Sequence, residues 1–241
     1  MIVPEKMYRY RSGITRIDDG TGGFDAGMNF LVMAPPMGLG RDLLYALTKP
    51  LDEEYAVVVS TNERASEVID AFRRAGSDKK YVGTIDAITK GSTPGVGDTN
   101  RQMFVASPTD LTGIGIKLSR MIELIFNGEF SEEENKLFPP PIRFCVNSLS
   151  TFLMYRRLDV LYQFLRALTS KVKKTDGVGF YLISNESFDV KTIALLEQLM
   201  DGVIEVKTEG DLPRLCVRGK DNIASGWFPF TISDGKVAES P

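Results

Sequence analysis

The chain has 241 residues, of which 43% are hydrophobic and 25% are charged. These proportions are ordinary for a globular protein with a buried core, and the length fits one large domain, so we expect a single domain over residues 1–241. A net charge of −3 provides no general basic field for binding nucleic acid. The absence of histidine excludes a histidine base and a histidine metal ligand within the chain.

The cysteines and the apolar stretches limit the chemistry and the location of the protein. Cys145 and Cys216 each lie in an apolar run without metal-ligand spacing, so we predict reduced, buried thiols and no metal site. No run of about 18 apolar residues is present, and residues 1–29 lack the apolar core of a signal peptide. We therefore expect a cytoplasmic protein that does not enter a membrane.

Short apolar runs alternate with amphipathic helical patterns along most of the chain. Strands are predicted at 30–34, 55–60, 81–85, 103–106, 142–146 and 179–184, and helices at 41–48, 65–74, 110–126, 158–172 and 190–200. This alternation predicts an α/β fold with a mostly parallel central sheet and helices on both faces. Three further apolar runs, 202–206, 214–217 and 228–232, have no helix between them and predict an antiparallel C-terminal edge.

The helix that ends at Phe126 begins at a glycine-containing segment, PTDLTGIG. Its buried side is predicted to consist of Ile116, Leu118, Ile122, Leu124 and Ile125. Gly113 and Gly115 leave two explanations open. The helix start either binds an anion or is capped by Thr109 or Asp110 and packs tightly at the glycines.

The turn after the first strand, APPMGLGRD, is where a ligand site is expected, because ligands bind beyond the carboxyl ends of parallel strands. Compared with the phosphate-binding pattern GxxxxGK[ST], Gly40 takes the second glycine position, Arg41 the lysine position and Asp42 the hydroxyl position. Gly38 is the other glycine of the loop, and Pro35 replaces the first glycine of the pattern. Proline removes a backbone donor and Asp42 repels phosphate, so the loop predicts weakened nucleotide binding. Asp42 could also hold magnesium directly, or simply favour the helix dipole.

Several segments together resemble KaiC-like proteins of the RecA superfamily, from about Ser12 to Val237. The matching segments are SGITRID at 12–18, the loop at 34–42, STNER at 60–64, NSLS at 147–150, DGVIEV at 201–206 and RLCVRGK at 214–220. The resemblance implies a RecA-like P-loop NTPase fold. The family's paired glutamates fall on Asn62 and Glu63, and its magnesium-binding aspartate falls on Asn147, whose amide lacks the negative charge. Within this superfamily, the segments SPTDLTGIG at 107–115 and SLSTFLMY at 148–155 look most like an archaeal subgroup with degenerate nucleotide motifs.

The changes at Arg41, Asp42 and Asn147 predict a non-hydrolysing domain with a vestigial nucleotide site formed by these residues with Gly38 and Gly40. We expect it to act as a protein-interaction or regulatory module, through a partner or through self-association, with no cofactor. Analogy at the level of the fold suggests archaeal signalling or motility.

The alternative is an ATPase with a non-standard loop. Arg41 would then contact the phosphates of ATP, Asp42 or Asp18 would recruit Mg²⁺, and Glu63 would act as the catalytic base. An ion pair between Arg41 and Asp42 would favour the first hypothesis, and an Arg41 that points into an empty cradle would favour the second.

A nucleic-acid module is the third hypothesis, based on the basic residues of the long helix and its ends. These are Arg156, Arg157, Arg166, Lys171, Lys173 and Lys174. The sequence favours a solvated helix face over a nucleic-acid site here, because no aromatic residues interleave with the cations.

Overall fold

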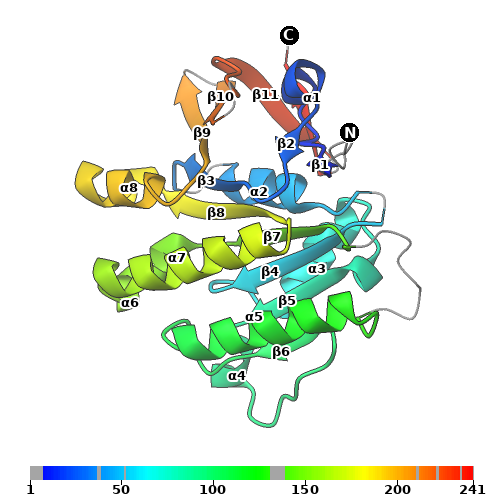
Figure 1. Ribbon diagram of the computed structural model, residues 1–241. Helices are drawn as coiled ribbons and strands as arrows, with labels where there is room; N and C mark the ends of the chain where they lie inside the picture. Colours follow the sequence, from blue (N-terminus) through cyan, green and yellow to red (C-terminus); the bar gives the residue numbers. More distant parts are fainter. Residues whose placement is uncertain are drawn as a thin grey trace, which may run out of the picture.

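The computed structural model describes residues 8–36, 39–51, 53–130, 139–209, 212–220, 223–233 and 235–240. Across these residues, one ten-stranded sheet runs through the molecule in the order β12-β11-β10-β9-β3-β8-β7-β4-β5-β6 (Figure 1). Its strands are β3 (Asn29–Ala34), β4 (Tyr55–Ser60), β5 (Val82–Asp86), β6 (Gln102–Phe104), β7 (Ile142–Val146), β8 (Val178–Ser184), β9 (Gly202–Glu209), β10 (Leu212–Gly219), β11 (Phe228–Ser233) and β12 (Lys236–Glu239). The strands from β9 to β6 are parallel to one another, which confirms the predicted mostly parallel sheet.

The C-terminal strands form the predicted antiparallel edge. β9 pairs antiparallel with β10, and the β10–β11 and β11–β12 pairs are antiparallel too. β9 also pairs in parallel with β3, so it joins the two parts of the sheet. The sequence did not predict β12, a four-residue strand in which only Val237 is buried and which therefore carries little apolar pattern.

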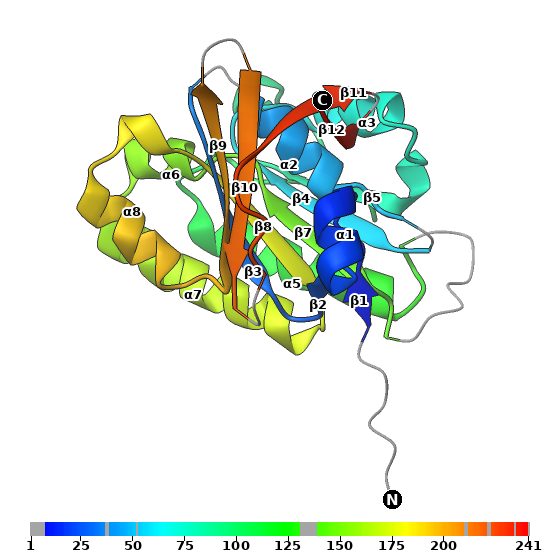
Figure 2. The same ribbon diagram turned by 90° about the horizontal axis from the view of Figure 1, so that it is seen from above.

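Helices cover both faces of this sheet (Figure 2). One face packs against α1 (Thr15–Thr21), α2 (Gly40–Thr48) and α3 (Ala65–Arg74), and the other packs against α5 (Leu111–Phe126), α6 (Leu149–Tyr155), α7 (Leu158–Lys174) and α8 (Val190–Glu197). A short helix α4 (Thr89–Ser92) and a two-stranded sheet of β1 (Arg9–Tyr10) and β2 (Phe24–Asp25) complete the elements. No helix in the described ranges is long and apolar enough to cross a membrane.

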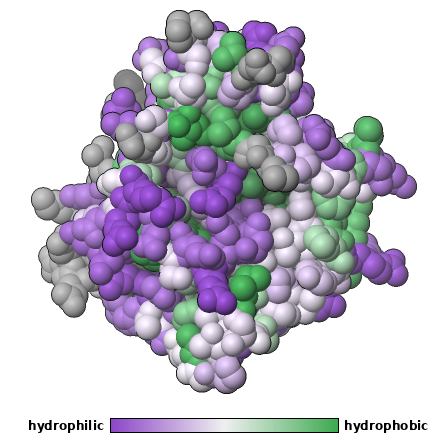
Figure 3. Space-filling view, turned by 180° about the vertical axis from the view of Figure 1, so that it is seen from behind, coloured by the Kyte–Doolittle hydropathy of each residue, from purple (hydrophilic) through white to green (hydrophobic). Residues whose placement is uncertain are grey.

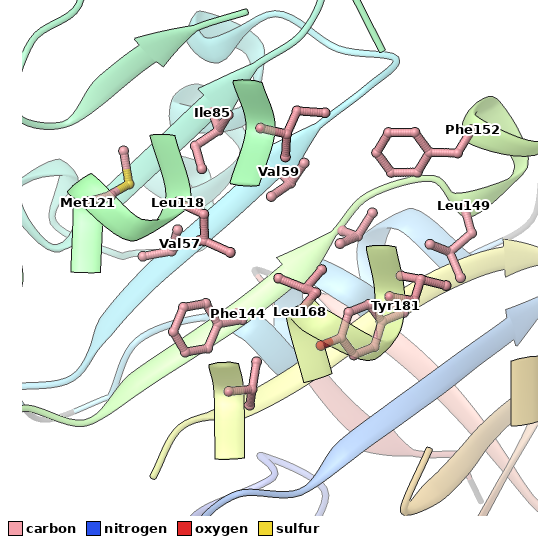
Figure 4. Close-up of a cluster of buried hydrophobic side chains, with 14 of the residues drawn as sticks. Val57, Val59, Ile85, Leu118, Met121, Phe144, Leu149, Phe152, Leu168 and Tyr181 are labelled. Atoms are coloured by element: carbon pink, nitrogen blue, oxygen red, sulfur yellow. The ribbon is translucent and has the colours of Figure 1, made fainter. Parts of the chain in front are cut away.

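Two hydrophobic cores lie on either side of the sheet because alternate residues of each strand point to opposite faces. In β4, Val57 and Val59 belong to the core under α5 to α8, whereas Ala56 and Val58 belong to the core under α2 and α3. Figure 4 shows part of the first core, in which Leu118 and Met121 of α5 approach the side chains of β4 and β5. A strand that is buried on both faces reads as a continuous apolar run, which is why these strands were visible in the sequence.

The buried side of α5 differs in part from the prediction. Leu118, Leu124 and Ile125 are buried, but Ile116 is 63% exposed, so its assignment to the buried side was wrong. The helical period places Ile114, Leu118 and Met121 toward the sheet, and Ile116 then points away from it.

A buried ion pair lies at the beginning of β7. Arg143 and Glu54 are 1% and 2% exposed, and the guanidinium donates to both carboxylate oxygens, at 2.5 Å from Nε and 3.1 Å from Nη2. The same guanidinium donates to the backbone carbonyl oxygens of Leu47 and Arg11, each at 2.8 Å. The pair therefore ties β7 to the end of α2 and to the N-terminal segment.

A second acidic residue organises the amino ends of β3 and β9. Asp201 accepts from the backbone N–H of Asn29 at 3.0 Å, and its other oxygen binds Lys173 at 3.0 Å and Lys220 at 2.8 Å. Burial alone would raise the pKa of Asp201, but the hydrogen bonds from Lys220 and Lys173 outweigh it and lower the pKa below its usual value.

This lowered pKa predicts a contribution of Asp201 to acid sensitivity. A carboxyl group whose pKa is lower in the folded state stabilises the fold above its unfolded pKa of about 4, and that stabilisation is lost as the pH falls through the folded pKa. We expect Asp201→Asn to lose less unfolding free energy than the wild type between pH 7 and about pH 3. Urea unfolding of both proteins at the two pH values measures this, and equal losses would contradict it.

Candidate functional site

The candidate site lies where the carboxyl ends of β3, β4 and β7 meet the beginning of α2. Gly40 begins this helix, and a Cβ atom there would lie 2.5 Å from the Cβ of Ala34 and 3.2 Å from Cδ1 of Leu182. Glycine is therefore required for α2 to pack directly on β3 and β8. Gly38, the other predicted loop glycine, lies outside the described residues.

Arg41 turns toward Glu63 rather than into an open cradle. Its Nη1 atom lies 3.1 Å from Oε1 of Glu63, whereas its Nε atom lies 3.8 Å from Oδ1 of Asp42. Arg41 and Asp42 are about half exposed, but the Glu63 side chain is 14% exposed. The ion pair between Arg41 and Asp42 considered from the sequence is therefore present, but Arg41 lies closer to Glu63, the residue at the family's catalytic position.

The second carboxylate oxygen of Glu63 is also occupied by donors from within the protein. The hydroxyl of Tyr45 donates to Oε2, and Nδ2 of Asn147 lies 3.3 Å from the same atom. Burial raises the pKa of Tyr45, and the nearby Cys145 and Glu63 raise it further, so the tyrosine hydroxyl keeps its proton. Glu63 thus forms an ion pair with Arg41 and accepts hydrogen bonds from Tyr45 and Asn147, and we call these four residues the Glu63 network.

Asn147 connects the Glu63 network to β4 through both ends of its amide. Nδ2 also donates to Oγ of Ser60 at 3.0 Å, and Oδ1 accepts from the backbone N–H of Thr61 at 2.9 Å. Asn147 is 2% exposed, so water cannot replace these partners. Only a group that both donates and accepts satisfies them all, which an amide does and a carboxylate does not.

The Asp42 side chain is 57% exposed in the first turn of α2. It lines a pocket of about 220 Å³ together with Arg41, Arg74, Ile232 and Gly235. Because Asp42 lies in the first turn of α2, its negative charge interacts favourably with the positive end of the helix dipole. No group of three acidic or cysteine side chains suited to a metal ion occurs in the part of the chain that the structure describes.

Other acidic residues singled out in the sequence have local structural roles. Asp18 accepts from the backbone N–H groups of Ser12 at 2.7 Å and Gly13 at 3.1 Å, and so holds the turn before α1. Asp110 caps α5 by accepting from the N–H of Gly113 at 2.7 Å, and a Cβ atom on Gly113 would collide with this carboxylate. The capping explanation of the PTDLTGIG segment is therefore the one that the structure supports.

The basic residues around α7 contact other parts of the protein. Lys171 donates to the hydroxyl of Ser119, Lys173 pairs with Asp201, and Arg156 donates to the backbone oxygen of Thr109 at 3.1 Å. These contacts hold α7 and its N-terminal end against the rest of the fold, and the solvated helix face, rather than a nucleic-acid site, stays a prediction.

Sequence reasoning missed Tyr45 and Ser60 as members of the site. Tyr45 follows Arg41 by four residues on α2, so helical spacing places both on one side, and the Arg41 guanidinium lies 5.9 Å from the Tyr45 ring centroid. That spacing was the available signal. Ser60 is the last residue of β4, where residues of a site are expected, but serine is common at strand ends and gave no specific signal.

Comparisons with solved structures agree with this architecture. A KaiC-like protein from the hyperthermophilic archaeon Pyrococcus horikoshii aligns with a TM-score of 0.67 and 15% identity, over 98% of this chain and 100% of that one. An uncharacterized protein from the same organism, solved in complex with an unknown peptide, aligns with a TM-score of 0.70 and 13% identity, over 95% and 98%. The fold is therefore that of KaiC-like, RecA-type domains.

The family follows from sequence. Residues 27–206, more than half of the chain, match a family of unknown function, DUF7504, and the protein belongs to that family. No curated protein matches the sequence.

Proposed function

We propose that this is a non-hydrolysing RecA-type domain that acts by binding another protein, with an internal network in place of a nucleotide site. The observation that carries the proposal is the pairing of Arg41 with Glu63 at 3.1 Å. This ion pair joins Arg41, at the phosphate-binding position, to Glu63, at the catalytic position, so that each charge is balanced by the other. The motif positions Arg41, Asp42 and Asn147 are degenerate in this view.

Magnesium and ATP fit these residues poorly. Glu63 is already paired with Arg41 and accepts hydrogen bonds from Tyr45 and Asn147, and the neutral amide of Asn147 is hydrogen-bonded at both its nitrogen and its oxygen. An incoming phosphate would have to displace Glu63 from Arg41 while approaching the carboxylate of Asp42, which is a repulsive exchange. Binding of ATP would therefore break contacts of the Glu63 network, and Asn147 would still provide no negative charge to hold magnesium.

A role in protein binding is consistent with two further observations. The related fold solved with an unknown peptide indicates that such a domain can present a peptide-binding surface. In this chain, large hydrophobic side chains remain exposed on α6 and α8. Self-association is the other form that this role can take, and analogy with archaeal KaiC-like proteins suggests a signalling or motility function in the cytoplasm.

Calorimetric titration with ATP and magnesium tests the proposal. We expect no heat of binding up to millimolar ATP, which corresponds to a binding free energy weaker than about −4 kcal/mol. The purified protein is also expected to carry no nucleotide. Micromolar binding would contradict the proposal and favour the ATPase alternative, and a turnover assay comparing wild type with Glu63→Gln would then decide whether Glu63 acts as a base.

A further inference from the structure

A groove between α7 and α8 is distinct from the Glu63 network. It has a volume of about 660 Å³, and the apolar and aromatic residues that line it are Leu158, Tyr162 and Leu195. Leu158 and Tyr162 are one helical turn apart on α7, so their side chains lie in line along the groove. This is the geometry in which a peptide can place successive apolar side chains between two helices.

Exposed hydrophobic side chains occur on the helices next to the groove, outside its lining. Among the described residues, six large hydrophobic side chains are exposed, and four of them, Met154, Tyr155, Val160 and Val190, belong to α6, α7 and α8. Val190 and Met154 are 86% and 74% exposed. Figure 3 views the molecule from behind, so α6 and α8, which lie on the left in Figure 1, come to the right. Hydrophobic surface is seen at the upper right of this view, and a further hydrophobic patch lies at its upper centre. Such concentration marks an interaction surface rather than scattered exposure.

The charges at the mouth of the groove indicate what kind of partner fits. The lining includes two cations, Arg157 and Lys191, and one anion, Asp159, which leaves one positive charge in excess. Arg157 pairs with Asp159 at 3.2 Å, but both side chains are more than half exposed, so water screens the pair. Lys191 forms no salt bridge with a described residue, and the nearby carboxylate of Asp189 caps α8 through the N–H of Thr192. An acidic partner would therefore meet a cation that is available for pairing.

We propose that the groove between α7 and α8 binds an amphipathic peptide segment of a partner protein, with apolar side chains over Leu158, Tyr162 and Leu195 and an acidic residue at Lys191. This inference rests on the proposed function, because it identifies the surface through which the domain would bind its partner. It does not depend on the Glu63 network, which lies at the carboxyl ends of β3, β4 and β7.

A random peptide library displayed on phage, panned against the full chain, is the test. We expect enriched peptides to combine apolar residues at helical spacing with Asp or Glu. Fluorescence anisotropy of an enriched peptide should show at least tenfold weaker binding to Leu195→Glu and to Lys191→Glu. Ile116→Glu is the matched control, because Ile116 is 63% exposed on α5 and does not line the groove. This variant should bind the peptide as the wild type does.

Several outcomes would overturn the proposal. One is that no peptide is enriched, and another is that the enriched peptides are basic. A third is that Ile116→Glu weakens peptide binding as much as Leu195→Glu and Lys191→Glu do. Concentration-dependent self-association that Leu195→Glu abolishes would assign the groove to a second copy instead, and binding to anionic vesicles that Lys191→Glu abolishes would assign it to lipid. Circular dichroism of each variant must show a folded protein. The calorimetric titration with ATP is independent, so failure of the groove proposal and failure of the non-hydrolysing proposal are distinguishable.

Discussion

Replacing Arg143 with methionine is expected to lower the free energy of unfolding by about 3–5 kcal/mol. The substitution keeps most of the apolar volume but removes the guanidinium that donates to Glu54. Glu54 then stays in a site where only 2% of its side chain is exposed, with hydrogen bonds from Tyr8 and from the backbone of Leu51 but no opposite charge. Desolvation of an unpaired carboxylate dominates the cost, and urea unfolding at neutral pH measures it.

Two further variants separate this cause from a loss of packing. Arg157→Met removes the same group from an exposed ion pair and is expected to cost less than about 1 kcal/mol. Arg143→Met combined with Glu54→Gln removes the charge, keeps one acceptor oxygen for the backbone N–H of Leu51, and provides an amide that can donate to the Tyr8 hydroxyl, so it should be more stable than Arg143→Met alone. If the double variant is as unstable as the single one, the charge of Glu54 is not the cause and the argument is wrong.

The fold could be predicted largely from the sequence because the signals for it are local. Strands buried on both faces appear as apolar runs, and the helices between them carry a period near 3.6, so the parallel sheet and its antiparallel edge followed. Arg143 shows the limit of prediction from local sequence patterns. A charged residue inside the apolar strand IRFCV is visible, but its partner lies 89 residues away, and no local pattern specifies that contact.

The elements that were missed have weaker or competing patterns. The segment of α6 is apolar on several sides, with Met154 and Tyr155 exposed and Phe152 buried, so its helical period is obscured. A capping signal was nevertheless present, because Ser148 accepts from the N–H of Thr151 at 3.1 Å. The two residues of β1 and of β2 are too short to produce any alternation.

The candidate site was predictable in position but not in its internal pairing. Glu63 and Asn147 could be placed together because each follows a strand of the same parallel sheet. Which groups satisfy them depends on the direction of the Arg41 side chain and on Tyr45, and these are properties of the packed structure. Arg41 and Asn147, two of the altered motif residues, are therefore best understood together, because both contact the carboxylate of Glu63. Tyr45 binds the same carboxylate.

This mutual dependence predicts that restoring the family's aspartate alone is harmful. Asn147→Asp should lower the free energy of unfolding by about 2–4 kcal/mol, although it changes one atom of the side chain. The new carboxylate cannot donate to Ser60, and it places a second negative charge near Oε2 of Glu63, which lies 3.3 Å from Nδ2 in the wild type. The side chain is 2% exposed, so solvent relieves little of the repulsion.

Combining Asn147→Asp with Glu63→Gln distinguishes the repulsion from the lost hydrogen bonds. The glutamine amide can donate to the new carboxylate and one negative charge is removed, so the double variant should recover part of the stability, even though Arg41 loses its partner. Urea unfolding of the four proteins in a double-mutant cycle gives the coupling energy. Wild-type stability in Asn147→Asp alone would mean that the site already compensates a second carboxylate, and the proposal of an internally satisfied, non-hydrolysing site would have to be abandoned.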